Sequence, residues 1–268
     1  MKQVLKSIVR STGLRRSHLA TARLCCERHV LATLSGRRDT PRKVGRILCY
    51  HSVGQPSWGV NDVSPADFRK HIELALSSGF RFVPAAEIVR NGAGPKDLAI
   101  TFDDGLKSVL DHAAPILAEF AVPWSAFIVS EWSDQTSSWP SDTFLSWRDV
   151  EKLAASGAEI GSHSATHPDF SQIEAAQVED ELGRSREVIR LRVGIDARSF
   201  AIPFGQSKNW PAIAAQAARA VGYDVVYAQA EDTRPAHTVA RTFITRYDSP
   251  RVFKAALQGA YDSWEEWF

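Results

Sequence analysis

The strongest constraint on the fold of this chain is the alternation of short apolar runs with longer amphipathic stretches after residue 43. The runs have the length and composition of β-strands, and the stretches carry apolar residues every three or four positions, as helices do. This alternation is typical of α/β proteins with a largely parallel sheet. The predicted strands are 46–50, 80–83, 98–102, 125–129, 159–161, 199–202 and 224–227, with a further strand at 239–245.

Helices are predicted between most of these strands, at 65–77, 109–120, 147–155, 173–191 and 211–220. Seven or eight such units suggest a barrel, and no repeat or linker divides residues 44–268, so we expect a single domain there. The stretch 130–146 is predicted to be a long loop, and loops at the carboxyl ends of barrel strands usually build the site. Trp139 and Trp147 could form an apolar wall against a sugar or an acetyl methyl group, or they could equally be packing anchors of the loop.

Residues 1–43 differ from the rest of the chain in charge. They carry eleven Lys or Arg and two acidic residues, about +9, which leaves about −8 for the remainder of a chain whose net charge is +1. The near balance of the whole chain gives no argument for nucleic acid. Apolar positions at roughly helical spacing, Val4, Leu5, Ile8, Val9 and Leu14, are compatible with a helix on an anionic membrane surface. They are equally compatible with a solvated, partly disordered extension.

Neither a spanning segment nor an export signal is recognisable in the sequence. The three cysteines are odd in number and do not make a disulfide framework. We therefore expect a cytoplasmic protein, with residues 1–43 as the candidate for peripheral contact with the inner face of the membrane.

Two carboxylates stand where the predicted strand 98–102 ends, at Asp103 and Asp104, followed by Gly105. Adjacent like charges raise each other's pKa unless a cation or strong donors lie nearby, so this pair indicates a partner. One of the two could instead simply cap the following helix.

Two imidazoles four residues apart, His163 and His167, follow the predicted strand 159–161. They can converge on one ion if the segment turns helically, although such a pair is often incidental surface chemistry. In a barrel both strand ends face the same side. One oxygen and two nitrogens would then leave open positions for water and substrate, as catalytic zinc or a similar divalent metal requires.

A third strand, 199–202, runs into a turn containing Pro203, Phe204 and Gly205. Such a turn can leave backbone N–H groups facing the site, and the N–H of Phe204 is our candidate for stabilising the oxyanion of a tetrahedral intermediate. An ordinary tight turn is the alternative.

The three motifs TFDDG, HSATH and FAIPFG, in this order and at these separations, resemble those of the NodB-like polysaccharide deacetylases, carbohydrate esterase family four, over roughly residues 44–268. The resemblance implies a distorted (β/α)7-type barrel. It also implies that Asp103 is the general base and that Asp104, His163 and His167 bind one divalent metal, zinc by preference, with cobalt, nickel or manganese as alternatives.

The chain departs from this family in two places. Ala201 stands where the third motif usually has an arginine that orients the base, and no histidine follows His237, so the usual late catalytic acid is missing. The apolar run 47–50 ends in His51, ahead of the first motif. A circular permutation would place this histidine where the missing one belongs, as in the branch that deacetylates poly-N-acetylglucosamine in exopolysaccharide and biofilm systems. We assign His51 as general acid; a buried histidine at a strand end is the alternative.

The predicted function is metal-dependent removal of N-acetyl groups from an amino-sugar polysaccharide, with an N-acetylated glycan as partner and acetate as product. Two alternatives remain open at this level. One is removal of another acyl group, such as formyl, from a lipid-linked sugar amide, and the other is a catalytically silent glycan-binding scaffold. The sequence does not indicate the native polymer or the oligomeric state.

Overall fold

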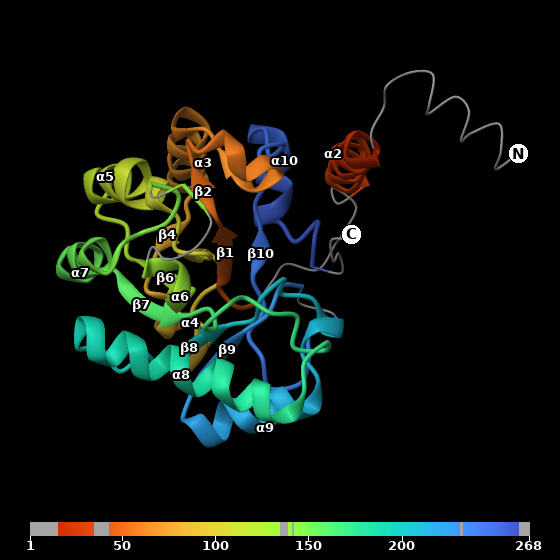
Figure 1. Cartoon of the computed structure of the whole chain (residues 1–268). Coiled ribbons are helices and arrows are strands. Elements are labelled where there is room, and N and C mark those ends of the chain that lie inside the picture. The colour runs from red at the N-terminus through yellow and green to blue at the C-terminus, as the bar shows by residue number, and fades with distance from the viewer. Residues whose placement is uncertain (1–15, 35–42, 135–138, 141, 231–232, 263–268) are drawn as a thin grey trace, which may run out of the picture.

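The computed structural model describes residues 16–34, 43–134, 139–140, 142–230 and 233–262. Its centre is a curled parallel sheet surrounded by helices (Figure 1). The strand order is β10-β1-β5-β6-β7-β8-β9, and β4 also pairs with β5. The strands are β1 Arg46–Tyr50, β4 Arg81–Phe82, β5 Asp97–Phe102, β6 Trp124–Ile128, β7 Glu159–Ser162, β8 Ser199–Ala201, β9 Val225–Tyr227 and β10 Thr242–Phe243. Each predicted strand is thus present, and the predicted α/β barrel is confirmed.

The barrel is closed by the last predicted strand, which divides its pairing between the two ends of the sheet. Val239 pairs in parallel with Tyr227 of β9, whereas Thr242 and Phe243 pair with β1. The predicted strand 239–245 is therefore shortened to the two residues of β10. Arg241 lies between the two pairings, and its backbone N–H donates to the carbonyl of Gln229 at 2.8 Å.

The helices cover the outside of the sheet in Figure 1. They are α3 Pro65–Ser77, α4 Ala85–Asn91, α5 Ala114–Glu119, α6 Ser130–Ser133, α7 Trp147–Ala155, α8 Ala175–Val193, α9 Ala212–Val221 and α10 Pro250–Leu257. The predicted helix 109–120 is divided, because Val109–Ala113 is π-helical and α5 begins just before Pro115. Proline has no N–H to continue the preceding hydrogen-bond pattern. The predicted loop 130–146 contains the short helix α6, and part of it lies outside the described residues.

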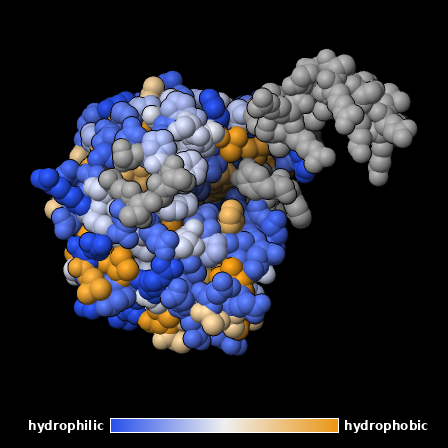
Figure 2. Space-filling view, viewed as in Figure 1, coloured by the Kyte–Doolittle hydropathy of each residue, from blue (hydrophilic) through white to orange (hydrophobic). Residues whose placement is uncertain are grey.

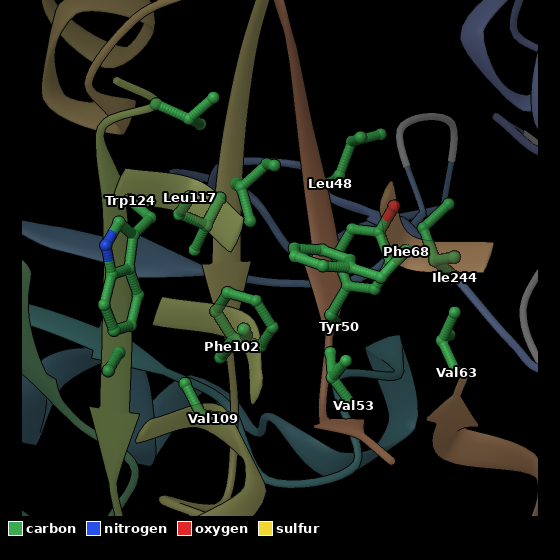
Figure 3. Packing of buried hydrophobic residues seen from close by; sticks show 14 of the residues in the cluster. Leu48, Tyr50, Val53, Val63, Phe68, Phe102, Val109, Leu117, Trp124 and Ile244 are labelled. Atoms are coloured by element: carbon green, nitrogen blue, oxygen red, sulfur yellow. The ribbon is translucent and has the colours of Figure 1, made fainter. Parts of the chain in front are cut away.

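Alternation along the strands separates two layers of buried side chains. Leu48, Tyr50 and Phe102 point outward and pack against α3, where Tyr50 meets Phe68 edge-on with ring centroids 5.1 Å apart (Figure 3). The intervening residues point into the barrel, where Ala99 belongs to a second buried cluster. Because successive side chains of a strand alternate, the carboxyl-terminal continuation of β5 directs Asp103 inward as well.

Helix α2, Arg16–Leu34, belongs to the predicted basic extension but docks on the domain beside α10 (Figure 1). Arg28 is fully buried and forms an ion pair with Asp248, which lies just before α10. Its guanidinium also lies 4.1 Å from the ring centroid of Tyr261. At least this part of the extension is therefore not wholly solvated. The domain boundary after residue 43 stays a prediction, and the apolar positions of residues 4–14 lie outside the described residues.

No helix in the described part of the chain is long and apolar enough to cross a membrane.

Candidate metal centre and active site

The residues singled out in the sequence meet at one end of the barrel. They line a pocket of about 540 Å³ at the carboxyl ends of the parallel strands: His51 after β1, Asp103 and Asp104 after β5, His163 and His167 after β7, and Phe204 after β8. The structure thus brings all six predicted site residues together, while their individual roles stay predictions.

Asp104, His163 and His167 form the candidate metal site. Asp104 Oδ1 lies 3.4 Å from His163 Nε2 and 3.6 Å from His167 Nε2, and the three ligand atoms all lie within 4.8 Å of one another. Donor atoms around a tetrahedral zinc ion are about 3.3 Å apart, given Zn–N and Zn–O bonds of ~2.0–2.1 Å. Asp104 Oδ1 is buried and accepts no hydrogen bond from any described residue. The three residues therefore fit a divalent metal.

His163 is oriented by the end of β8. Its Nδ1 lies 2.8 Å from the carbonyl oxygen of Ala201, so Nδ1 carries the proton and donates, and the lone pair of Nε2 faces Asp104. Burial lowers the pKa of His163, but the carboxylates of Asp103 and Asp104 outweigh it and raise the pKa above its ordinary value. Ala201, where the family pattern has an arginine, contributes its backbone to the site.

The two imidazoles converge without the helical turn that their spacing of four residues suggested as the route. The backbone φ angles of Ser164 and His167 are +71° and +64°, in the left-handed region, so the segment loops back on itself. The buried carboxylate of Glu181 on α8 holds this loop by accepting from the backbone N–H groups of Ala165 and Thr166, both at 2.9 Å. The hydrogen bonds to Glu181, rather than a helical turn of the segment itself, therefore hold His163 and His167 close together.

Asp103 is held by Arg241, a residue outside the three sequence motifs. The guanidinium donates to Oδ1 at 2.6 Å and to Oδ2 at 2.7 Å, a two-pronged ion pair in which both residues are buried. Burial raises the pKa of Asp103, but the guanidinium of Arg241 and the neighbouring imidazole of His163 outweigh it and hold the pKa below its ordinary value. Arg241 therefore gives Asp103 an orienting cation, which Ala201 in the third motif cannot provide.

Asp104 divides its two oxygens between different partners. Oδ1 faces the imidazoles, and Oδ2 accepts a hydrogen bond of 2.9 Å from the indole nitrogen of Trp58. Burial raises the pKa of Asp104, but the imidazoles of His51, His163 and His167 outweigh it and hold the pKa well below its ordinary value. The carboxylate is thus ionised and directed toward the metal position.

His51 lies where the permuted pattern predicts it, at the end of β1. Its ring meets Phe243 of β10 edge-on, with centroids 5.4 Å apart, and its Nδ1 makes no hydrogen bond to a described residue. Burial lowers the pKa of His51, although the charges of Asp104 and Asp103 oppose the shift. The histidine thus lines the pocket without a carboxylate partner of its own within the described chain.

Phe204 sits in a tight turn with its φ at +63°, followed by Gly205 at +69°. Its side chain is 52% exposed at the rim of the pocket, and its ring lies 4.8 Å from that of His167. The predicted role of its backbone N–H in stabilising an oxyanion stays a prediction.

One side of the pocket is an aromatic wall, formed by Trp58, Trp132 and Trp139, and the buried ring of Phe144 packs against these three. Trp58 lies 6.5 Å from Trp132, 5.7 Å from Trp139 and 5.5 Å from Phe144, measured between ring centroids. Trp132 also stacks on His167 at 5.3 Å. Of the two predicted wall residues, Trp139 is part of it. Trp147 does not line the pocket and donates its indole N–H to Asp134 instead.

Comparisons with known proteins agree with this architecture. A family profile described as polysaccharide deacetylase matches residues 90–226. A chitooligosaccharide deacetylase of Sinorhizobium fredii is 26% identical over 120 residues, which are 44% of this chain and 51% of that protein. A bifunctional xylanase/deacetylase of Pseudobutyrivibrio xylanivorans is 24% identical over 44% of this chain and 18% of its own length. This chain thus spans about half or less of these curated relatives.

Two solved structures share the fold over most of the described chain. The Streptococcus pyogenes deacetylase PplD, in complex with acetate, aligns with a TM-score of 0.69 and 21% identity over 81% of this chain and 99% of its own. IcaB from Ammonifex degensii aligns with a TM-score of 0.67 and 24% identity over 81% of this chain and 98% of its own.

Proposed function

Since this chain belongs to the polysaccharide deacetylase family, we propose that it is a metal-dependent hydrolase that removes N-acetyl groups from an amino-sugar glycan and releases acetate. One observation carries the proposal: three metal-binding side chains converge beside a buried carboxylate that an arginine keeps ionised. Metal ligands together with a positioned base are the arrangement that hydrolysis of an amide requires.

In this reaction the oxygen of water forms a bond to the acetyl carbon, and the bond from that carbon to the sugar nitrogen breaks. A divalent metal held by Asp104, His163 and His167 would supply polarisation of the acetyl carbonyl and a lower pKa for the attacking water. Asp103, fixed by Arg241, takes the proton of the water at a carboxylate oxygen.

Phe204 and His51 carry out the remaining steps. The backbone N–H of Phe204 donates to the carbonyl oxygen as negative charge develops on it. His51 protonates the departing nitrogen, so the products are acetate and a free sugar amine. Each amine exposed in this way carries positive charge at neutral pH, which changes how a glycan adheres to anionic surfaces.

We also propose an identity for the metal and for the substrate. One carboxylate oxygen and two imidazole nitrogens suit zinc, with cobalt, nickel or manganese as substitutes. The aromatic wall provides flat apolar faces for sugar rings, which favours a glycan chain over a small soluble amide. We propose a polymer of N-acetylated amino sugars, of the exopolysaccharide or biofilm class, as the substrate.

We propose further that the protein acts at the cytoplasmic face of the membrane. Residues 1–15 contribute four positive charges and none that is negative. Figure 2 shows hydrophobic surface where α2 joins the body, and Val30 and Leu34 of this helix are 55% and 53% exposed. Basic and apolar groups at one end of a chain favour anionic lipid surfaces.

A deletion that tests the membrane proposal should end at residue 15. A longer one would remove Arg28 and leave the carboxylate of Asp248 buried without its cation. The full-length protein should sediment with vesicles that contain anionic phosphatidylserine, and the protein without residues 1–15 should stay in the supernatant. Equal sedimentation of the two proteins, or none by either, would sink the proposal.

The proposed activity is tested by acetate release from N-acetylglucosamine oligomers. Purified protein should release acetate, lose this activity on chelation and regain it when zinc is returned, and Asp104→Ala should abolish it. If zinc binds but no acetate appears, the substrate carries another acyl group or the barrel is a silent glycan-binding scaffold. Formate release from formylated sugars then distinguishes these two outcomes.

A further inference from the structure

Trp58 belongs to the aromatic wall of the pocket, and its indole nitrogen also contacts the carboxylate of Asp104, a candidate metal ligand. Its indole nitrogen donates to Asp104 Oδ2 at 2.9 Å, while Asp104 Oδ1 faces His163 and His167. The indole N–H is therefore the partner that occupies one oxygen of this carboxylate and leaves the other for a metal ion. None of the three sequence motifs includes this residue.

The position of Trp58 is itself fixed by two sets of contacts. Its ring packs against Trp132 and Trp139 of the aromatic wall and against the buried ring of Phe144. Its backbone belongs to the short 3-10 segment Pro56–Asn61, where its N–H donates to the carbonyl of Gln55 at 2.9 Å.

The start of this segment is anchored by a single carboxylate. Asp62 Oδ1 accepts from the backbone N–H of Gln55 and from the hydroxyl of Ser52, both at 2.7 Å. The donor thus approaches Asp104 on a rigid indole ring that is already held by ring packing and by backbone hydrogen bonds, so little conformational entropy opposes its hydrogen bond to Asp104.

We infer that Trp58 is a positioning residue for the metal ligand Asp104. Its indole N–H holds Oδ2 and so makes Asp104 a ligand through one oxygen, in a fixed orientation toward the two imidazoles. Partners of this kind orient a ligand and raise metal affinity, and their loss typically weakens metal binding ~10–100-fold. The inference rests on the proposed metal role of Asp104, and it adds a residue from a segment that precedes the first motif.

A consequence concerns the link between glycan and metal. The ring of Trp58 lies in the wall that faces the pocket, and its N–H reaches the metal site. Trp132, which contacts the ring of Trp58, also stacks on His167. Two of the three metal-binding side chains are thus supported by the surface on which the sugar is proposed to lie.

The test is zinc affinity, measured by competition with a chromophoric chelator on the full-length protein. Trp58→Phe keeps an aromatic ring but removes the N–H donor together with one ring of the indole. Trp147→Phe is the matched control, because it removes an indole N–H that donates to the carboxylate of Asp134 at 2.6 Å, away from the pocket. We expect zinc binding ~10–100-fold weaker for Trp58→Phe and unchanged for Trp147→Phe.

Each outcome has a separate meaning. If the unmodified protein binds no zinc, the proposed metal site fails. If it binds zinc and both variants match it, the metal site stands and the role of Trp58 is refuted. Circular dichroism shows whether Trp58→Phe folds. Should it not fold, the indole N–H resonance of Trp58 in the unmodified protein decides: a shift of this resonance on zinc addition, with that of Trp147 constant, supports the inference, and an unshifted resonance overturns it.

Discussion

Replacing Arg241 by methionine tests the assignment of the residue that orients the base. The change removes the only guanidinium that contacts Asp103 within the described chain and leaves a carboxylate that is 3% exposed without its cation. Breaking a buried ion pair on one side costs about 3–5 kcal/mol in unfolding free energy. For a protein of this size each kcal/mol corresponds to roughly 2–4 °C, so we expect the melting temperature to fall by roughly 6–20 °C.

The same change should suppress catalysis. Loss of Arg241 removes the largest influence that lowers the pKa of Asp103, so the pKa rises and less of the carboxylate is ionised and able to accept a proton. A positioned general base contributes typically ~10²–10⁴-fold to the rate, and we expect a loss of kcat of at least ~10²-fold at neutral pH. Acetate release under zinc saturation measures this loss, and zinc binding should change much less than kcat.

The double variant Asp103→Asn, Arg241→Met provides the control for stability. A neutral amide needs no cation, so the double variant should be more stable than Arg241→Met alone. The reasoning is refuted if Arg241→Met melts within ~2 °C of the unmodified protein and keeps activity within about threefold, since a buried uncompensated carboxylate excludes both results.

Three further predictions concern other parts of the site and the fold. His51→Gln should lower kcat for acetate release ~10²–10⁴-fold without changing the zinc content measured by atomic absorption, because His51 is assigned to proton transfer alone. Glu181→Gln should weaken zinc binding in chelator competition by ~10-fold or more, since a neutral acceptor holds the loop before His167 less firmly. Asp149, whose carboxylate lies 2.8 Å from both Lys107 and Lys152, has a lowered pKa because these partners outweigh the effect of burial. Its contribution to stability is complete above the pKa of an unfolded Asp, about 3.9, and is lost as pH falls through the folded value. The difference in urea unfolding free energy between the unmodified protein and Asp149→Asn should therefore be largest near pH 7 and shrink below about pH 4; a difference that grows toward acid would contradict the assignment.

The sequence predicted those elements whose pattern is complete within a few residues. The strand Arg46–Tyr50 and the helices Pro65–Ser77 and Trp147–Ala155 have the predicted bounds. Both helices begin after a serine whose side chain accepts from the backbone N–H three residues later, a local signal that fixes a helix start. The candidate metal ligands could be selected for a similar reason, because each follows a predicted strand.

What the sequence did not predict depends on contacts between distant segments. Arg241 meets Asp103 only because the barrel closes, and neither residue signals this pairing locally. Alternation along the predicted strand 239–245, combined with closure, could have placed Arg241 inside the barrel. Trp58 and the buried side of α2 gave no such signal. In the sequence, Arg28 is one of many basic residues in a charged segment, and nothing nearby indicates its ion pair with Asp248, 220 residues away.

Closure of the barrel by residues 239–243 also sets the order in which the site can form during synthesis. Asp103 leaves the ribosome 138 residues before Arg241 does. At roughly 5–20 residues per second, the nascent chain carries this carboxylate for on the order of ten seconds without the cation that permits its burial. Strand β1, which ends just before His51, likewise cannot pair with its neighbour β10 until residues 242–243 have been synthesised. The catalytic end of the barrel is thus a late product of translation, and shorter nascent chains expose it to chaperones and proteases.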